Sequence, residues 1–281
     1  MKERVLSLAL CGLCLLSGCQ AGEAVQEEIW ELEEENAAVF ADGQAADRWR
    51  GYQDGLREPW VLYELSDGTV LLTEDDPAGP EGDAAYAALS EEVQAAVSAW
   101  CEGEGRRYDL AALLGSCYAR WQELGPEAFE PGRVTQTTSA VAAAEGVVYL
   151  VTTVDLAVDP AAGETAHYGA FFDRETGQRL ELWSLFTVPE EEARMALASA
   201  AGDDPDVCRQ LADAIDPGRV LFFAEHLEVE YPAGTFEELD TPYTVDRAAL
   251  HSKSRNCPYH GQQLYGRVDV TLRGGRVTWK R

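Results

Sequence analysis

The sequence predicts an α+β fold in which an antiparallel sheet carries helices packed on one side. Three observations lead to this prediction. Strand-like segments follow one another in blocks joined by short hairpin turns, helix-like segments occupy separate blocks, and 46% of the 281 residues are hydrophobic. A chain of this length and composition can form one large domain or two small ones and is not wholly disordered.

An N-terminal hairpin and a helical pair are the first elements expected. Residues 60–65 and 69–73 carry strand-forming side chains on either side of an Asp-Gly turn. Ser90 and Asp109 each stand just before apolar residues at helical spacing, so each is expected to cap a helix. A Gly-Pro pair at residues 125–126 ends the second helix.

Strands dominate the middle of the chain, and helices and further strands follow them. The first strands are expected at residues 134–144, 147–158, 165–173 and 178–182. A capping box at residues 187–190 begins one helix, and Asp204 with Pro205 begins another. The last strands are expected at residues 220–223, 227–231, 266–272 and 276–279. The final two form a C-terminal hairpin across a Gly-Gly turn.

The first 18 residues have the features of a lipoprotein signal peptide. Lys2 and Arg4 precede an apolar stretch at residues 5–16, which is shorter than the roughly 20 residues that a membrane-spanning helix needs. Residues 16–19, Leu-Ser-Gly-Cys, resemble the lipobox of bacterial lipoproteins. The resemblance implies diacylglyceryl transfer to Cys19, cleavage before it, and a mature chain anchored by lipid at the extracytoplasmic face of the cell membrane. The alternative is an ordinary signal peptide in which Cys19 is incidental.

Residues 19–48 are expected to form an acidic tether, and residues 49–281 a single α+β domain. Residues 20–48 hold nine acidic residues, one Arg and few apolar positions, which is typical of a solvated segment. Residues 49–246 carry 39 acidic and 11 basic residues, whereas residues 247–281 carry eight basic residues and one Asp. This basic end either folds back onto the acidic body or forms a partner site.

The charge of the chain excludes one class of partner and favours another. It has 22 Lys and Arg residues against 50 Asp and Glu residues, a net charge of −28, so nucleic acid is repelled. Cationic proteins, in contrast, are attracted by long-range steering. The sequence has no phosphate-binding glycine loop or nucleotide motif, and no cofactor is expected.

Four cysteines remain once the signal peptide is removed and Cys19 carries lipid, and an even number in an exported protein favours disulfides. The preferred pairs are Cys101 with Cys117 and Cys208 with Cys257. The first pair flanks a short break between two helical stretches, so its closure is local. Free buried thiols are the alternative.

Several short stretches resemble one family of bacterial extracytoplasmic domains. Residues 171–186, FFDRETGQRLELWSLF, resemble its signature of Thr-Gly followed by spaced Leu residues and a final Phe. Residues 221–232, LFFAEHLEVEYP, resemble its strand pair, and residues 233–234 and 241–243 resemble its ending. The family is the C-terminal domain of RsiV-type anti-sigma factors, a domain of unknown function also found beside some peptidoglycan deacetylases. The resemblance covers about residues 60–250.

The resemblance implies an α+β fold and, as in some members, binding of a lysozyme-like protein. One departure lies before the strand at residue 171. In place of a Gly-Gly-Ala-His type segment this chain has Glu-Thr-Ala-His-Tyr-Gly at residues 164–169, which keeps His167 and its small neighbour. A sigma-binding segment, a spanning helix and a deacetylase domain are also missing from the sequence, so regulation of a sigma factor by this chain alone is not implied.

No residue is proposed to be catalytic, and no metal site is expected. The sequence lacks Gly-x-Ser-x-Gly, and a structural or exposed role is expected for His167 and His226. His251, Cys257 and His260 lie close together in sequence but do not complete a set of four zinc ligands.

Carboxylates are numerous, so a glycosidase pair can always be nominated. Catalysis needs two of them at a fixed separation in a cleft. The candidates are Glu190, Glu191, Glu192, Glu225, Glu228 and Glu230. Outward positions on a sheet and favourable interaction with a helix N-terminus explain these residues without chemistry. Asp203, Asp204 and Asp206 likewise fit a helix cap and lack the spacing of a calcium-binding EF-hand.

The sequence therefore predicts a non-catalytic, lipid-anchored binding protein for a protein or cell-wall partner. A cationic lysozyme-like hydrolase is one candidate partner. The alternative is a cell-wall glycan hydrolase that uses an Asp/Glu pair, and a deep cleft with two carboxylates and several aromatic residues would distinguish it. A solute-binding lipoprotein is disfavoured because alternating βα units of two lobes are not visible.

Overall fold

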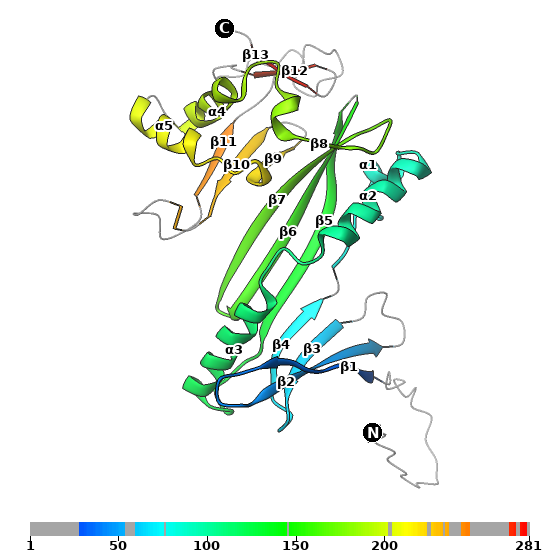
Figure 1. The fold of residues 1–281 in the computed structure, drawn as a ribbon, viewed down its shortest axis with the longest axis vertical. Coiled ribbons are helices and arrows are strands. Elements are labelled where there is room, and N and C mark those ends of the chain that lie inside the picture. Colours follow the sequence, from blue (N-terminus) through cyan, green and yellow to red (C-terminus); the bar gives the residue numbers. More distant parts are fainter. Residues whose placement is uncertain are drawn as a thin grey trace, which may run out of the picture.

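A large sheet of eight strands, which follow one another in sequence order, forms the body of the fold (Figure 1). The strands are β1 (Glu28–Val39), β2 (Ala45–Gln53), β3 (Trp60–Leu65), β4 (Val70–Asp75), β5 (Gly132–Ala144), β6 (Val147–Asp159), β7 (Ala162–Asp173) and β8 (Arg179–Leu180). All neighbours are antiparallel except β4 and β5, which are parallel. This computed structural model describes residues 28–53, 60–75, 77–144, 146–201, 204–223, 226–232, 234–235, 243–247, 270–273 and 276–279.

Three helices lie between β4 and β5, as expected because parallel neighbours need a crossover connection. They are α1 (Ala84–Ala87), α2 (Glu91–Glu104) and α3 (Leu110–Leu124), and they pack on one face of the large sheet. The side chains of Ser90 and Asp109 accept hydrogen bonds from the N–H groups of Val93 and Ala112, so both predicted helix caps are present. The predicted α+β class is confirmed.

A smaller sheet and two more helices follow β8. The elements are η1 (Leu182–Leu185), α4 (Glu190–Ala198), η2 (Ser199–Ala201), α5 (Pro205–Asp213), η3 (Pro217–Arg219), β9 (Val220–Phe222), β10 (Leu227–Tyr231) and β11 (Tyr243–Arg247). Phe222 is 1% exposed and contacts the rings of Tyr149 and Phe171, with centroids 5.1 and 4.9 Å away. Because side chains alternate along a strand, this aromatic core lies on the face of β6 and β7 opposite to α2.

A short hairpin ends the described part of the chain. β12 (Val270–Arg273) pairs antiparallel with β13 (Arg276–Trp279), and Arg273 lies opposite Arg276. The predicted C-terminal hairpin is therefore present. That the basic C-terminal end folds back onto the acidic body stays one of two predictions, beside that of a partner site.

The expected acidic tether is wrong for residues 28–48, which form β1 and the start of β2. The acidic side chains of this segment are compatible with a strand because basic side chains lie beside them: Glu33, for example, forms ion pairs with Arg48 and Arg50. After β1, Phe40 stacks on Tyr118 of α3 with ring centroids 3.9 Å apart. The folded region therefore starts well before residue 49.

The predicted lipid anchor falls on residues that the structure does not describe. Residues 1–18 and Cys19 all precede the first described strand. Among the helices that are described, none is both long and apolar enough to cross a membrane.

The predicted disulfide between Cys101 and Cys117 is not formed, and both side chains are free thiols. Cys101 packs beside the core under α2, whereas Cys117 lies in the separate core under α3, so the two helices hold them in different places. Burial raises the pKa of each thiol to about 11. Of the second predicted pair, Cys208 is buried on α5, and Cys257 lies outside the described residues.

Candidate functional site

Two buried carboxylates and one open hollow are the candidate sites in the described part of the chain. We name them the Glu74 cluster (Glu74, Tyr63, Arg106, Tyr108), the Glu230 cluster (Glu230, Arg219, His167, Tyr168) and the hollow. The hollow is lined by Arg133, Thr135, Asp155, Leu156, Ala157, Gly163, Glu164 and Thr165.

In the Glu74 cluster a buried carboxylate of β4 is surrounded by donors. Glu74 is 1% exposed, and its two oxygens accept hydrogen bonds from Arg106 Nε at 2.5 Å and Nη2 at 3.0 Å. The hydroxyl of Tyr63 on β3 donates to it at 2.7 Å, and the hydroxyl of Tyr108 donates as well. A fork-shaped guanidinium bound to both carboxylate oxygens is the strongest common pairing of these groups.

The donors in this cluster keep Glu74 ionised in spite of its burial. Burial by itself would raise the pKa of Glu74, but the hydrogen bonds from Arg106, Tyr108 and Tyr63 outweigh it and lower that pKa. Burial, together with the hydrogen bond to Glu74, raises the pKa of Tyr63 to about 12. A carboxylate held as a stable anion in this way is poorly suited to accept or donate a proton near neutral pH.

The Glu74 cluster also fixes the connection between α2 and α3 onto the sheet. Arg106 and Tyr108 belong to this connection, and Gln136 on β5 binds it at two further points. Gln136 accepts from the N–H of Arg107 at 2.8 Å and donates to the carbonyl of Gly105 at 2.9 Å. We conclude that the cluster is structural, because Arg106 and Tyr108 join the helix connection to the sheet and Tyr63 joins two neighbouring strands of it.

In the Glu230 cluster a carboxylate of β10 meets the edge of the large sheet. Arg219 Nη1 lies 2.9 Å from Glu230 Oε2, and both side chains are largely buried, at 11% and 8% exposed. Glu230 accepts from the backbone N–H of His167 at 2.9 Å, while Arg219 donates to the carbonyl of His167 at 3.0 Å. The Arg219 guanidinium also lies 3.9 Å from the ring centre of Tyr168.

These contacts occupy the backbone of His167 as a neighbouring strand would. The imidazole Nδ1 of His167 lies 3.2 Å from Glu230 Oε1, so the ring is held by the same carboxylate. Glu230 and Arg219 thus join the small sheet to β7. The structure thus places His167 at the junction between the small sheet and β7.

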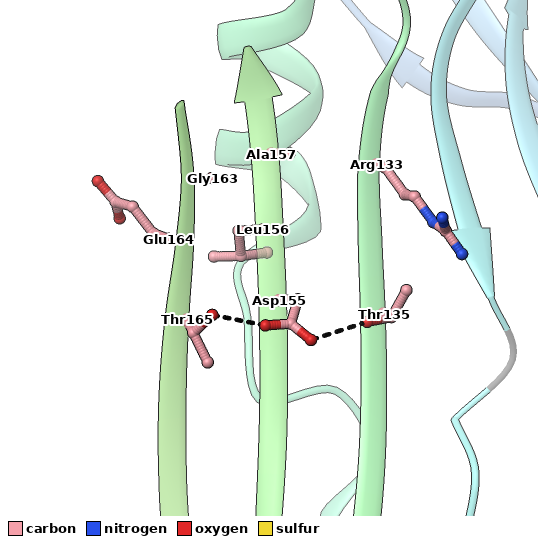
Figure 2. A pocket seen from close by; sticks show the side chains of 8 residues that line it. All are labelled: Arg133, Thr135, Asp155, Leu156, Ala157, Gly163, Glu164 and Thr165. Atoms are coloured by element: carbon pink, nitrogen blue, oxygen red, sulfur yellow. Dashed lines mark hydrogen bonds between the residues drawn. The ribbon is translucent and has the colours of Figure 1, made fainter. Parts of the chain in front are cut away.

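The hollow is an open depression of about 430 Å³ on the face of β5, β6 and β7 (Figure 2). Thr135, Asp155 and Thr165 lie side by side on the three strands. The two oxygens of Asp155 accept from the hydroxyls of Thr165 at 2.6 Å and Thr135 at 3.5 Å. Arg133 turns toward β4, where it pairs with the carboxylate of Asp75 at 2.8 Å.

The hollow lacks the arrangement that a glycosidase needs. Its two carboxylates are those of Asp155 and Glu164, and Glu164 points away from Asp155 at the outer side of β7 (Figure 2). Its lining includes no aromatic residue. Two convergent carboxylates around a sugar ring are therefore not provided here.

Three of the carboxylates nominated from the sequence form ion pairs within the chain. Glu190 lies in the first turn of α4 and pairs with Arg194 at 2.8 Å. Glu228 on β10 pairs with His226, whereas its neighbour Glu230 binds Arg219. Asp204 caps α5, as predicted. Asp203 and Glu225 lie outside the described residues.

Within the residues that the structure places, no group of three or more His, Cys, Asp and Glu side chains is arranged to hold a metal ion. His251, Cys257 and His260 are not among those residues. Sequence reasoning missed Glu74, Arg106, Arg219 and Asp155 altogether. The one signal for the Glu74 cluster was Arg106-Arg107, the only adjacent basic pair in residues 49–246.

Comparison with known proteins gives no match to a protein-family model. The dihydroorotases of Anaeromyxobacter dehalogenans (strain 2CP-1 / ATCC BAA-258) and Anaeromyxobacter sp. (strain K) are each 38% identical to this chain over 79 residues. That similarity covers 25% of this chain and 17% of each dihydroorotase. The chain thus spans less than a fifth of the length of these curated relatives.

Two solved structures that resemble this fold in part are DUF3298 family proteins, whose family is defined by a domain of unknown function. The protein from Pseudomonas aeruginosa PAO1 is 15% identical, with a TM-score of 0.35 over 73% of this chain and 88% of its own. The protein from Bacteroides fragilis NCTC 9343 is 9% identical, with a TM-score of 0.37 over 80% and 90%. Similarity at this level carries no argument about what this chain binds.

Proposed function

We propose that this chain is a non-catalytic binding protein that is anchored by lipid on Cys19 at the extracytoplasmic face of the membrane. Its RsiV-type-like domain binds a cationic protein, such as a lysozyme-like hydrolase, or a cell-wall component. One observation carries the proposal. The two buried glutamates, Glu74 and Glu230, are each matched by an arginine, so the excess of 28 negative charges belongs to the rest of the chain.

Exposed carboxylates of one sign create a potential that concentrates positively charged partners near the surface. The described acidic residues that are exposed include Glu91 and Glu92 on α2, Glu191 on α4 and Asp206 on α5. Association steered in this way is fast at low salt and weakens as salt screens the field. An acidic surface suits the recognition of a cationic partner, and in the hollow Asp155 can bind one basic side chain of that partner.

The alternative of a glycan hydrolase has weaker support. It would need a second carboxylate turned toward Asp155, and the nearest candidate in the hollow, Glu164, is turned away (Figure 2). The buried carboxylates are held by arginine within the fold. We therefore favour binding over hydrolysis.

The proposal is tested by the binding of egg-white lysozyme to residues 20–281 in a salt series. We expect the dissociation constant to rise by about tenfold or more between 50 and 300 mM NaCl, because screening shortens the Debye length from about 14 to about 6 Å. Succinylated lysozyme is the matched control, since its lysine ammonium groups are replaced by carboxylates. Absence of binding at low salt, or affinity that is indifferent to salt, would contradict the proposal.

A further inference from the structure

The outer edge of β7 is only partly covered by the rest of the described chain. β8 pairs with Phe171 and Phe172 alone. Nearer the start of β7, the backbone N–H and C=O of His167 form hydrogen bonds with Glu230 and Arg219. Toward the start of β7, residues 161–165 are exposed, and no described strand pairs with them on the side opposite to β6 (Figure 1).

The direction of the free backbone groups follows from the contacts of His167. Its N–H and C=O point away from β6, because they bind Glu230 and Arg219 instead. Alternate residues of a strand present their backbone groups to the same side, so the N–H and C=O of Thr165 also point away from β6. An edge with free donors and acceptors is a ready template for another strand.

Glu230 and Arg219 set the limit of this open edge. Their carboxylate and guanidinium take the positions that the carbonyl and amide of a neighbouring strand would take at His167. Glu230 and Arg219 therefore prevent an added strand from pairing with β7 at His167. Among the described residues, no side chain binds the backbone N–H or C=O of Thr165 in the way that Glu230 and Arg219 bind those of His167.

The side chains around this edge are acidic. Glu164 points outward from β7, and Asp155 lies in the hollow one strand further in (Figure 2). Arg133, the one base of the hollow, is engaged by Asp75. A strand added beside β7 would place the residue opposite Thr165 on the face of the hollow, about 10 Å from the backbone of β6. A Lys or Arg side chain there can extend over Thr165 toward Asp155.

We propose that the open edge of β7 at residues 162–166 binds an extended, lysine- or arginine-containing segment of the partner as an additional antiparallel strand. This inference rests on the proposed function, since it names how the cationic partner is held. Backbone hydrogen bonds to Thr165 supply affinity, and Asp155 selects basic side chains on the face of the hollow.

Thr165→Pro is the variant that tests the edge. The N–H of Thr165 points away from β6, so proline removes no bond of the sheet and is tolerated there as on other edge strands. Thr165→Val is the matched control, because it loses the same hydroxyl bond to Asp155 but keeps the N–H. We expect Thr165→Pro to weaken binding of a seven-residue, acetylated and amidated peptide of alternating Lys and Val by about tenfold or more relative to Thr165→Val. Equal affinities of the two variants would overturn the inference.

A second measurement uses the unaltered protein and so does not depend on the folding of a variant. The peptide residue opposite Thr165 belongs to a hydrogen-bonded pair, so the N–H of each Lys that faces the hollow points toward β7. N-methylation of the Lys amides is expected to abolish binding, whereas N-methylation of the Val amides preserves it. Loss of binding with both peptides, or with neither, would overturn strand addition.

Lysozyme binding separates this inference from the proposed function. If lysozyme binds the unaltered protein and Thr165→Pro equally well, strand addition is wrong and the proposed function stands. If lysozyme fails to bind the unaltered protein at low salt, the proposed function is wrong. Even then, if methylation of the Lys amides abolishes peptide binding and methylation of the Val amides does not, the edge of β7 is supported as a site for basic strands.

Discussion

Replacement of Arg219 with alanine is expected to lower the free energy of unfolding by about 4 kcal/mol, because it leaves the carboxylate of Glu230 buried without its partner. The same change removes the hydrogen bonds of Arg219 to the carbonyl of His167 and to the hydroxyl of Tyr168. Urea unfolding followed by circular dichroism measures the effect, with the slope of the transition checked for change.

Two control variants separate the loss of the buried ion pair from the general effect of replacing an arginine. Arg209→Ala removes an ion pair with Asp206 whose side chains are 66% and 81% exposed, and we expect a change within about 0.5 kcal/mol. Arg219→Lys keeps the charge but lacks the planar fork that reaches Glu230 and Tyr168 together, so an intermediate loss is expected. If Arg219→Ala were no more harmful than Arg209→Ala, the Glu230 cluster would not be holding the small sheet to β7.

Replacement of Arg106 with alanine is expected to lower the free energy of unfolding by about 3 kcal/mol. Glu74, which is 1% exposed in the unaltered protein, would keep only tyrosine hydroxyls of the cluster as partners. The loss is smaller than for Arg219 because the side chain of Arg106 is 35% exposed, so water can partly replace it. The double variant with Glu74→Gln and Arg106→Met is expected to recover part of the loss, since it removes the unpaired charge.

The lowered pKa of Glu74 also predicts how the stability of the protein depends on pH. The pKa of Glu74 is lower in the folded protein than its usual value of 4.5, so the unfolded chain takes up a proton first as pH falls. The stability that Glu74 contributes is therefore complete above pH 4.5 and is lost as pH falls through the lowered pKa. We expect the difference between the unaltered protein and Arg106→Ala to be smaller at pH 3 than at pH 7. A difference that grows on acidification would show that Glu74 is not the anion held by Arg106.

Much of the fold follows from local signals in the sequence. Ser90, Asp109 and Asp204 stand at the starts of their helices because a short polar side chain there accepts backbone N–H groups that have no partner within the helix. The hairpin of β5 and β6 follows from two strand-forming segments around a Glu-Gly turn, and Gly146 has the positive φ of 87° that such a turn requires.

The strands β1 and β2 were not predictable from composition in the same way. Nine acidic residues in a short segment indicate a solvated chain when only the segment is considered. In the fold the cost of these charges is reduced by Arg48 and Arg50, which lie on the neighbouring strand beside Glu33. The disulfide prediction failed for a related reason, since nearness of Cys101 and Cys117 in sequence says nothing about which core each helix faces.

The charged clusters depend on contacts between distant parts of the chain. Arg106 binds a carboxylate 32 residues before it, and the backbone of His167 meets a carboxylate 63 residues after it. No spacing rule links such residues. The row of Thr135, Asp155 and Thr165 cannot be found from the sequence either, because only the register of β5, β6 and β7 brings these residues together.

The buried clusters hold the fold together, and we propose that the open face of β5, β6 and β7 recognises the cationic partner. The affinity of two conservative variants for lysozyme distinguishes these two roles. Asp155→Asn alters the exposed face, whereas Tyr108→Phe removes one hydrogen bond to buried Glu74. At 50 mM NaCl and under conditions where both variants are folded, we expect Asp155→Asn to weaken binding by about threefold or more and Tyr108→Phe to leave it unchanged. Weakened binding in Tyr108→Phe together with unchanged binding in Asp155→Asn would show that the open face of β5, β6 and β7 is not the binding surface.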